Sequence, residues 1–262
     1  MATRAETVRV LDRCFDEIEQ LTASLTADDW AVPSLCPAWD VAGVVRHLAA
    51  VEHILSGWLP EGDDITPPFG AIAAFDTEAA AWDPDRLAEE ARRIFAGRRT
   101  ELAAMTDEQF GGPSMTPVGP GTYHRFMEIR IFDFWVHARD ITTPLGRAGD
   151  DGGPAAEISV DEVEGSIGYI VGKKVGLPDG MSIAFHLTGP VTRDIYAAVD
   201  GRAARVDGLT APSVEVTTDS LTFVQLACGR TDPQDVIDAG RISWTGDAEW
   251  GERAARNLRF TM

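Results

Sequence analysis

The segment from Glu128 to Asp140 is apolar around most of a helical circumference, and neither glycine nor proline interrupts it. This pattern predicts a helix with a largely apolar surface. Asp133 and His137 lie four residues apart within it, and a rotation of about 100° per residue places one above the other on the same face. The segment therefore constrains the fold and, at the same time, places a carboxylate and an imidazole side by side.

Three further stretches in the first half carry apolar residues at helical spacing. The second of them begins at Asp40, where an acidic cap is favourable. The four predicted helices cover about 8–25, 40–58, 85–105 and 122–142. Segments rich in glycine and proline predict loops at 59–70 and 111–121, with a short helix at 71–82 between the second and third long helices. The pattern predicts a four-helix bundle, and bundle cores are where such folds hold metals.

The second half has a different character. A glycine- and proline-rich linker at 143–156 comes first, and strand-like segments then alternate with helices. The dipeptide Asp200-Gly201 is typical of a hairpin turn. Strands are predicted at 182–187, 195–199, 203–206, 213–217 and 241–244, and helices at 159–175, from 219 onward and at 248–258. We therefore predict a two-domain α+β protein, with a helical bundle at 1–145 and a small α+β domain at 157–262.

Composition excludes several classes of function. The 262 residues carry a net charge of −19, whereas nucleic-acid and anionic-membrane binding need a basic surface. Three cysteines, far apart and odd in number, are typical of a reducing compartment. The chain shows no apolar signal core and no apolar run long enough to span a bilayer. We expect a cytoplasmic protein with a small-molecule partner, as a monomer or a homodimer.

His47 completes a set of candidate metal ligands. It lies about 60° from Val44 and about 40° from Val51, inside the apolar stripe of the second helix. Two imidazoles and one carboxylate are a typical catalytic set for a divalent ion, with one position left open. Two alternatives remain open: a hydrogen-bonded core histidine, and an internal network of Arg130, Asp133 and His137 or a solvent-facing stripe.

A rival pair stands on the same predicted helix. His124 and Glu128 are also four residues apart and could bind a metal. The thirteen residues from His124 to His137 rotate the helix by about 220° net, so the two pairs face roughly opposite directions. Spacing alone does not choose between them.

Two segments resemble a known family. Residues 33–41 (PSLCPAWDV), which run into Arg46-His47-Leu48, and residues 132–141 (FDFWVHARDI) resemble the signatures of the mycothiol-dependent maleylpyruvate isomerase family of the DinB-like superfamily. Residues 219–230 (DSLTFVQLACGR) and 245–247 (TGD) resemble its C-terminal domain, which is related to sterol carrier proteins. The resemblance covers nearly the whole chain and implies a DinB-like metal-binding four-helix bundle followed by an α+β domain.

The resemblance also implies roles for individual residues. The ligands of the family carry over to His47, Asp133 and His137, and Asp140 matches a trailing Asp that we interpret as an outer partner or a helix-end residue. The family usually has Glu where this chain has Asp133, so the carboxylate is one methylene shorter. That change predicts a metal closer to this helix, or a weaker site. Arg230 resembles an arginine at the interdomain cleft of the family, a candidate catalytic partner for an anionic substrate.

In this family the metal, usually zinc, is thought to bind the thiol of mycothiol. Coordination to a dication ionises a thiol, whose free pKa is about 8.5, at neutral pH. The thiolate would add to the cis double bond of maleylpyruvate, and rotation followed by thiolate loss would give fumarylpyruvate. We therefore expect a metal-dependent isomerase or thiol S-transferase that acts on an electrophilic small molecule. The alternatives are a non-catalytic protein that binds a small ligand in the interdomain cleft, and a family member that has lost its metal.

Arg130 and Cys36 are two further candidates for a chemical role. Arg130 lies on the ligand face of its helix and is a second candidate partner for an anionic substrate, although a surface position is the more common one for arginine. Cys36 lies in a proline-flanked loop with no paired base visible in the sequence, so we do not expect it to be a nucleophile.

Overall fold

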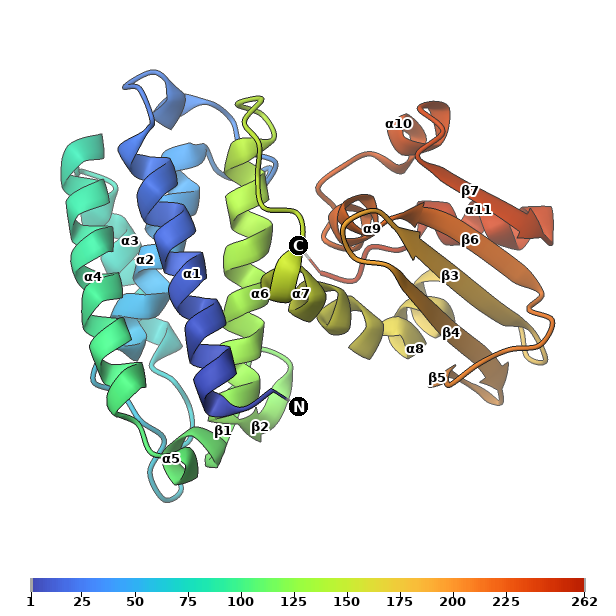
Figure 1. The fold of residues 1–262 in the computed structure, drawn as a ribbon, viewed down its shortest axis with the longest axis horizontal. Coiled ribbons are helices and arrows are strands. Elements are labelled where there is room, and N and C mark those ends of the chain that lie inside the picture. The colour runs from blue at the N-terminus through green and yellow to red at the C-terminus, as the bar shows by residue number, and fades with distance from the viewer. Residues whose placement is uncertain (1, 262) are drawn as a thin grey trace. The chain divides into compact units, whose positions relative to one another are not determined.

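The computed structural model describes residues 2–261, and the chain divides into two compact units between Gly149 and Asp150 (Figure 1). The first unit is built on four long helices, namely α1 (Arg4–Ala23), α2 (Val41–Leu55), α4 (Pro84–Ala104) and α6 (Tyr123–Thr142). Its short helices are η1 (Asp29–Ala31), η2 (Phe69–Ala71), α3 (Ile72–Ala79) and α5 (Asp107–Gly111). The predicted four-helix bundle is confirmed.

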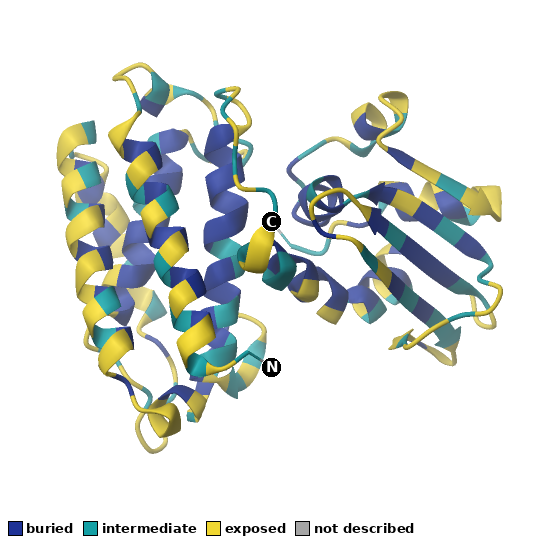
Figure 2. Cartoon of the chain, viewed as in Figure 1, coloured by how far each residue is buried: buried dark blue, intermediate teal, exposed yellow. Residues whose placement is uncertain are grey.

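Side-chain caps and an aromatic core explain why these helices form and pack. The carboxylate of Asp40 accepts a hydrogen bond from the amide of Gly43 at 2.7 Å, so α2 begins where the sequence predicts. The apolar sides of α1 and α2 pack against α4 and α6. In the core the ring of Phe15 stacks on Phe95, with centroids 4.9 Å apart, and meets Phe134 edge-on at 5.1 Å. Buried residues occupy most of the length of α6 (Figure 2).

The predicted loop at 111–121 is wrong in part. It contains a short antiparallel hairpin of β1 (Pro113–Thr116) and β2 (Gly119–Thr122). Gly119 has a φ of 112°, which a glycine adopts without strain and which closes the turn. Strands of four residues rich in glycine and proline carry no alternating pattern that a sequence reading could detect.

The second unit is a five-stranded sheet with helices. Its strands are β3 (Ser182–Thr188), β4 (Arg193–Asp200), β5 (Arg202–Val206), β6 (Val214–Asp219) and β7 (Ile242–Gly246), in the order β5-β4-β3-β6-β7. The pair β3–β6 is parallel and the other pairs are antiparallel. Gly201, with a φ of 64°, turns β4 into β5 as predicted. The predicted fold class, a helical N-terminal part followed by an α+β part, is confirmed.

The helices of the second unit differ from the prediction at several points. They are α7 (Gly153–Gly165), α8 (Ile167–Tyr169), the π-helix η3 (Ile170–Val175), α9 (Ser220–Ala227), α10 (Pro233–Asp238) and α11 (Ala248–Arg256). The predicted linker is shorter, because Pro154 opens α7 rather than excluding a helix. Among residues 2–261, no helix combines the length and the apolar character that crossing a membrane requires.

Candidate metal centre

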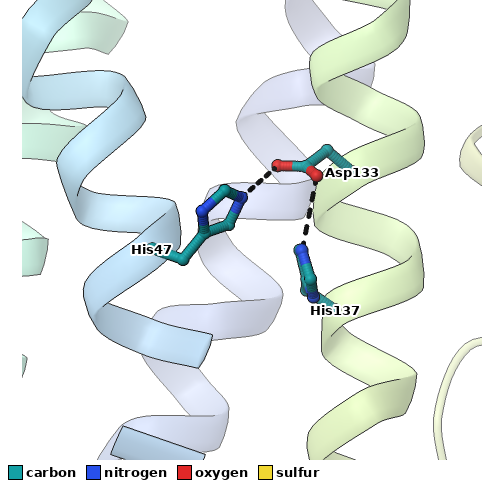
Figure 3. A group of neighbouring side chains, drawn as sticks. All are labelled: His47, Asp133 and His137. Atoms are coloured by element: carbon teal, nitrogen blue, oxygen red, sulfur yellow. Dashed lines mark hydrogen bonds and ion pairs between the residues drawn. The ribbon is translucent and has the colours of Figure 1, made fainter. Parts of the chain in front are cut away.

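The bundle brings His47, Asp133 and His137 together, and their ligand atoms all lie within 4.8 Å of one another (Figure 3). His47 comes from α2, whereas Asp133 and His137 lie one turn apart on α6. Nε2 of His47 is 3.3 Å from Oδ2 of Asp133, and Nε2 of His137 is 3.4 Å from Oδ1. Bond lengths of about 2.0–2.1 Å at tetrahedral angles separate two ligands of a zinc ion by about 3.3–3.4 Å. The two distances to Asp133 therefore suit a divalent ion.

Among residues 2–261, the rival pair has no third ligand beside it. His124 and Glu128 approach to 3.7 Å, and Nε2 of His124 is 2.8 Å from the hydroxyl of Thr7 on α1. Within the described residues, the cluster of His47, Asp133 and His137 is the one group that could hold a metal. The helical phase difference that the sequence predicts thus separates the two pairs.

The loop before α2 supports both histidines. Its Trp39 stacks on the imidazole of His47, with centroids 4.8 Å apart, and lies 5.7 Å from that of His137. The amide of Leu35 donates to the carbonyl of Asp140 at 3.1 Å and ties this loop to α6. A Cβ atom on Gly43 would lie 2.8 Å from Cβ of Trp39, so the close approach of the indole requires glycine there. Trp39 was not predicted as a site residue, although it lies within the motif at 33–41.

Asp140 orients His137. Nδ1 of His137 donates to Oδ2 of Asp140 at 2.8 Å, and Asp140 is fully buried. This bond directs Nε2 toward Asp133, the arrangement that outer carboxylates impose on metal-binding histidines. Burial alone would lower the pKa of His137, but the carboxylates of Asp133 and Asp140 outweigh it and raise the pKa to about 9.

Asp133 is ionised in this setting. Burial alone would raise its pKa, but the neighbouring side chains of Arg130, His137 and His47 hold the pKa of Asp133 well below its usual range. Nη1 of Arg130 donates directly to Oδ2 of Asp133. The internal Arg–Asp–His network that the sequence left open is therefore present, and two of its members, Asp133 and His137, are also candidate ligands. The expectation that Arg130 more commonly lies at the surface is wrong, because only 3% of it is exposed.

Glu52 and Arg98 are buried charged residues that were not predicted from the sequence. Glu52 is fully buried on α2, and it accepts hydrogen bonds from Nε of Arg130 at 2.9 Å and from Nε of Arg98 at 3.0 Å. A signal was available, because Glu52 stands four residues after Leu48 and three before Leu55, inside the apolar stripe of α2.

Arg230 belongs to the second unit, whereas the three candidate ligands belong wholly to the first. It follows α9 and is buried, with Nη1 donating to the carbonyl of Cys228 at 2.9 Å. Arg230 is therefore not a surface arginine. Cys36 is half-buried in the loop that carries Trp39.

The comparisons with known proteins agree with one another. The family model described as the mycothiol maleylpyruvate isomerase N-terminal domain matches residues 11–142, and the model of the C-terminal domain of that family matches residues 157–253. Two uncharacterized proteins from different strains of Mycobacterium tuberculosis are each 26% identical to this chain over 142 residues. The match covers 50% of this chain and 53% of each relative, so the chain spans about half the length of the curated relatives it matches.

Solved structures show the same fold. The crystal structure of the mycothiol-dependent maleylpyruvate isomerase matches with a TM-score of 0.63 and 17% identity over 88% of this chain and 93% of that one. A mutant of that enzyme matches with the same TM-score and identity over 95% and 98%. Because the two family models together cover most of the sequence and lie in the order of the two units, the chain belongs to the mycothiol-dependent maleylpyruvate isomerase family.

Proposed function

We propose that this protein is a metal-dependent enzyme that activates a low-molecular-weight thiol, mycothiol, for addition to an electrophilic small molecule. The observation that carries the proposal is the convergence of two imidazoles and one carboxylate from α2 and α6 at spacings that suit a divalent ion. Zinc is the proposed metal, because three nitrogen and oxygen donors with an open fourth position are typical of catalytic zinc. Family membership supports mycothiol as the thiol and isomerisation as the reaction, with S-transfer as the second form of the same chemistry.

The residues of the chain fit this chemistry. A bound dication would ionise a thiol at neutral pH. The side chains of His47 and Asp133 are 23% and 25% exposed, whereas that of His137 is 6% exposed, so a thiol and an electrophile would approach from the side of His47 and Asp133. Trp39 covers the imidazoles on another side and Asp140 fixes His137 from behind. These contacts hold the donors in place before a ligand arrives.

The shorter carboxylate of Asp133 remains suited to the site. Its two oxygens face one histidine each, at 3.3 and 3.4 Å, although the side chain is one methylene shorter than the usual Glu. Arg130 keeps it ionised, and an ionised carboxylate is what a zinc ion binds. These contacts favour a competent site over one that has lost its metal.

Metal content and thiol-dependent turnover test the proposal. Protein purified without chelator is expected to contain about one zinc ion per chain, because the described residues offer one such donor cluster. Zinc-loaded protein is then expected to convert cis-alkene or other electrophilic substrates only when mycothiol is added. Absence of metal would contradict the proposal. Stoichiometric metal without thiol-dependent turnover of either cis-alkene or other electrophilic substrates would favour the alternative of a non-catalytic binding protein.

Zinc affinity is expected to rise with pH between about 6.5 and 8. The metal-free protein carries a proton on His137, because Asp133 and Asp140 overcome the effect of burial and raise its pKa from 6.5 to about 9. Zinc must displace this proton, so each pH unit below the folded pKa lowers the affinity about tenfold. Calorimetric titrations in two buffers of different ionisation enthalpy measure the displaced proton, and zinc binding without proton release at pH 7 would contradict the prediction.

The same raised pKa stabilises the metal-free fold. The contribution is fully present below pH 6.5, the unfolded value, and it is lost as the pH rises through about 9. Urea unfolding of chelator-treated protein at several pH values measures it. A His137→Gln variant, which cannot titrate, is the control that should lack this component of the pH dependence.

Arg230 is the proposed partner of an anionic group on the electrophile. A buried arginine offers a charge-assisted, two-pronged hydrogen bond to a carboxylate, worth roughly 1.5–3 kcal/mol, so Arg230→Ala is expected to raise KM or lower kcat/KM about tenfold to 100-fold. Steady-state kinetics with mycothiol and an anionic substrate measure the change. Arg241→Ala, in the same unit, removes an exposed arginine that donates to the hydroxyl of Thr222 and should leave the kinetics unchanged. Unaltered kinetics in Arg230→Ala would remove this role.

A further inference from the structure

A row of alternating charges leads from the candidate metal centre into the core of the bundle. Asp133 is hydrogen-bonded to Arg130, Arg130 is hydrogen-bonded to Glu52, and Glu52 is hydrogen-bonded to Arg98. Glu52 is fully buried and uses both of its oxygens, Oε1 for Arg130 and Oε2 for Arg98. A carboxylate in this position is costly to bury, and the two guanidinium groups offset that cost. The row therefore joins the core of the bundle to a candidate metal ligand.

Glu52 is what holds Arg130 from the side of the core. Arg130 donates through Nε to Glu52 and through Nη1 to Asp133, while its buried Nη2 has no hydrogen-bond partner among residues 2–261. The guanidinium of Arg130 also lies over the ring of Phe134, whose centroid is 5.1 Å from Cζ. A ring face restrains a guanidinium less directionally than a hydrogen bond does. Without Glu52, therefore, Asp133 alone would fix the orientation of the guanidinium by hydrogen bonding.

The charge of Arg130 matters for a metal bound at Asp133. A guanidinium that donates to a carboxylate oxygen competes with a dication for that oxygen, and its positive charge repels the dication. Glu52 offsets this charge at a distance of one hydrogen bond, 2.9 Å from Nε of Arg130. Its removal would leave Arg98 and Arg130 with one carboxylate fewer between them, and the surroundings of the centre would become more positive by one unit.

We infer that Glu52 is a positioning residue of the metal centre, which holds Arg130 so that Asp133 is oriented toward the two histidines and offsets the positive charge beside the metal. This inference rests on the proposed function, because it concerns the same centre. Glu52 acts through Arg130 and is not itself a ligand, since it does not belong to the donor cluster. Glu52 on α2 and Arg130 on α6 are 78 residues apart in the sequence.

The test is the zinc affinity of Glu52→Gln in the full chain, measured by competition with a chromophoric chelator. Loss of an outer partner typically weakens metal binding about 10–100-fold, and we expect a fall of that size. The visible spectrum of the cobalt-loaded protein should also change, because it reports the arrangement of the ligands. Glu101→Gln is the matched control: it removes a carboxylate that accepts from Arg98 at 2.8 Å but does not contact Arg130, and it should keep wild-type zinc affinity.

The outcomes separate the inference from the proposed function. If the wild type binds no zinc, the proposed function fails and takes the inference with it. If the wild type binds zinc and Glu52→Gln, shown to be folded by circular dichroism, binds it equally well, the inference alone is overturned. Should Glu52→Gln fail to fold, Glu52→Asp replaces it: the shorter side chain cannot reach both guanidinium groups, and an unchanged zinc affinity in that variant would equally overturn the inference.

Discussion

Replacing His137 with alanine is expected to remove zinc from the purified protein. His137 supplies one of three donors, and its Nε2 lies 3.4 Å from Asp133, the third donor being His47. Outer partners of metal ligands alone typically contribute about 10–100-fold to affinity, so loss of a ligand should weaken zinc binding by more than about 100-fold. Elemental analysis of the variant and the wild type, purified side by side without chelator, measures the effect.

His124→Ala is the matched control for this experiment. His124 stands on the same helix, and its Nε2 lies 2.8 Å from the hydroxyl of Thr7, outside the donor cluster. It should therefore retain zinc at the wild-type ratio. Zinc loss in His124→Ala together with zinc retention in His137→Ala would show that the metal binds at the rival pair, and the candidate centre would be wrong.

The sequence predicts two possible ligand pairs on α6 but does not choose between them. Helical phase places Asp133 and His137 on one face of α6, and the structure agrees. The same rule pairs His124 with Glu128 equally well, because phase is a local property of one helix. Which face of α6 meets α2 depends on how the bundle packs, and α6 contacts both α1 and α2. The family resemblance supplied the choice that spacing could not.

The burial of charged side chains in the bundle was not predicted from the sequence. The expectation that arginines lie at the surface is a good average, yet Arg98 and Arg130 are 1% and 3% exposed. Each is tolerated because it has a carboxylate partner: Glu52 stands between them, 46 residues from Arg98 and 78 from Arg130. A lone sequence shows that Glu52 interrupts an apolar stripe, but it does not show which distant guanidinium offsets the charge.

The short elements were missed for a different reason. The hairpin of β1 and β2 has four residues in each strand, and α10 has six residues, lengths at which periodicity cannot be distinguished from chance. The long helices were predicted because their apolar stripes extend over several turns. Prediction therefore succeeded where a local pattern repeats and failed where structure depends on tertiary packing.

Arg98→Met is expected to lower the free energy of unfolding of the bundle by about 3–5 kcal/mol, the usual loss when a buried charge keeps its place and one of its partners is removed. Arg98 donates to Glu52 at 3.0 Å and to the hydroxyl of Tyr123 at 2.8 Å, both buried, and methionine fills similar space without a donor. In the variant, Arg130 would be the one remaining guanidinium partner of Glu52. Urea unfolding of chelator-treated protein, followed by circular dichroism, measures the loss without a contribution from metal binding.

Arg99→Met is the control, because the neighbouring arginine has comparable ion pairs in a different setting. Arg99 contacts Asp12, Asp16 and Glu19, and its side chain is 25% exposed. Exposed pairs contribute about 0–1 kcal/mol each, so this variant should lose less than Arg98→Met. Equal losses would mean that the buried row adds little to stability beyond what a surface network adds. Its remaining role would then be the orientation of Asp133, which the zinc affinity of Glu52→Gln measures independently of folding.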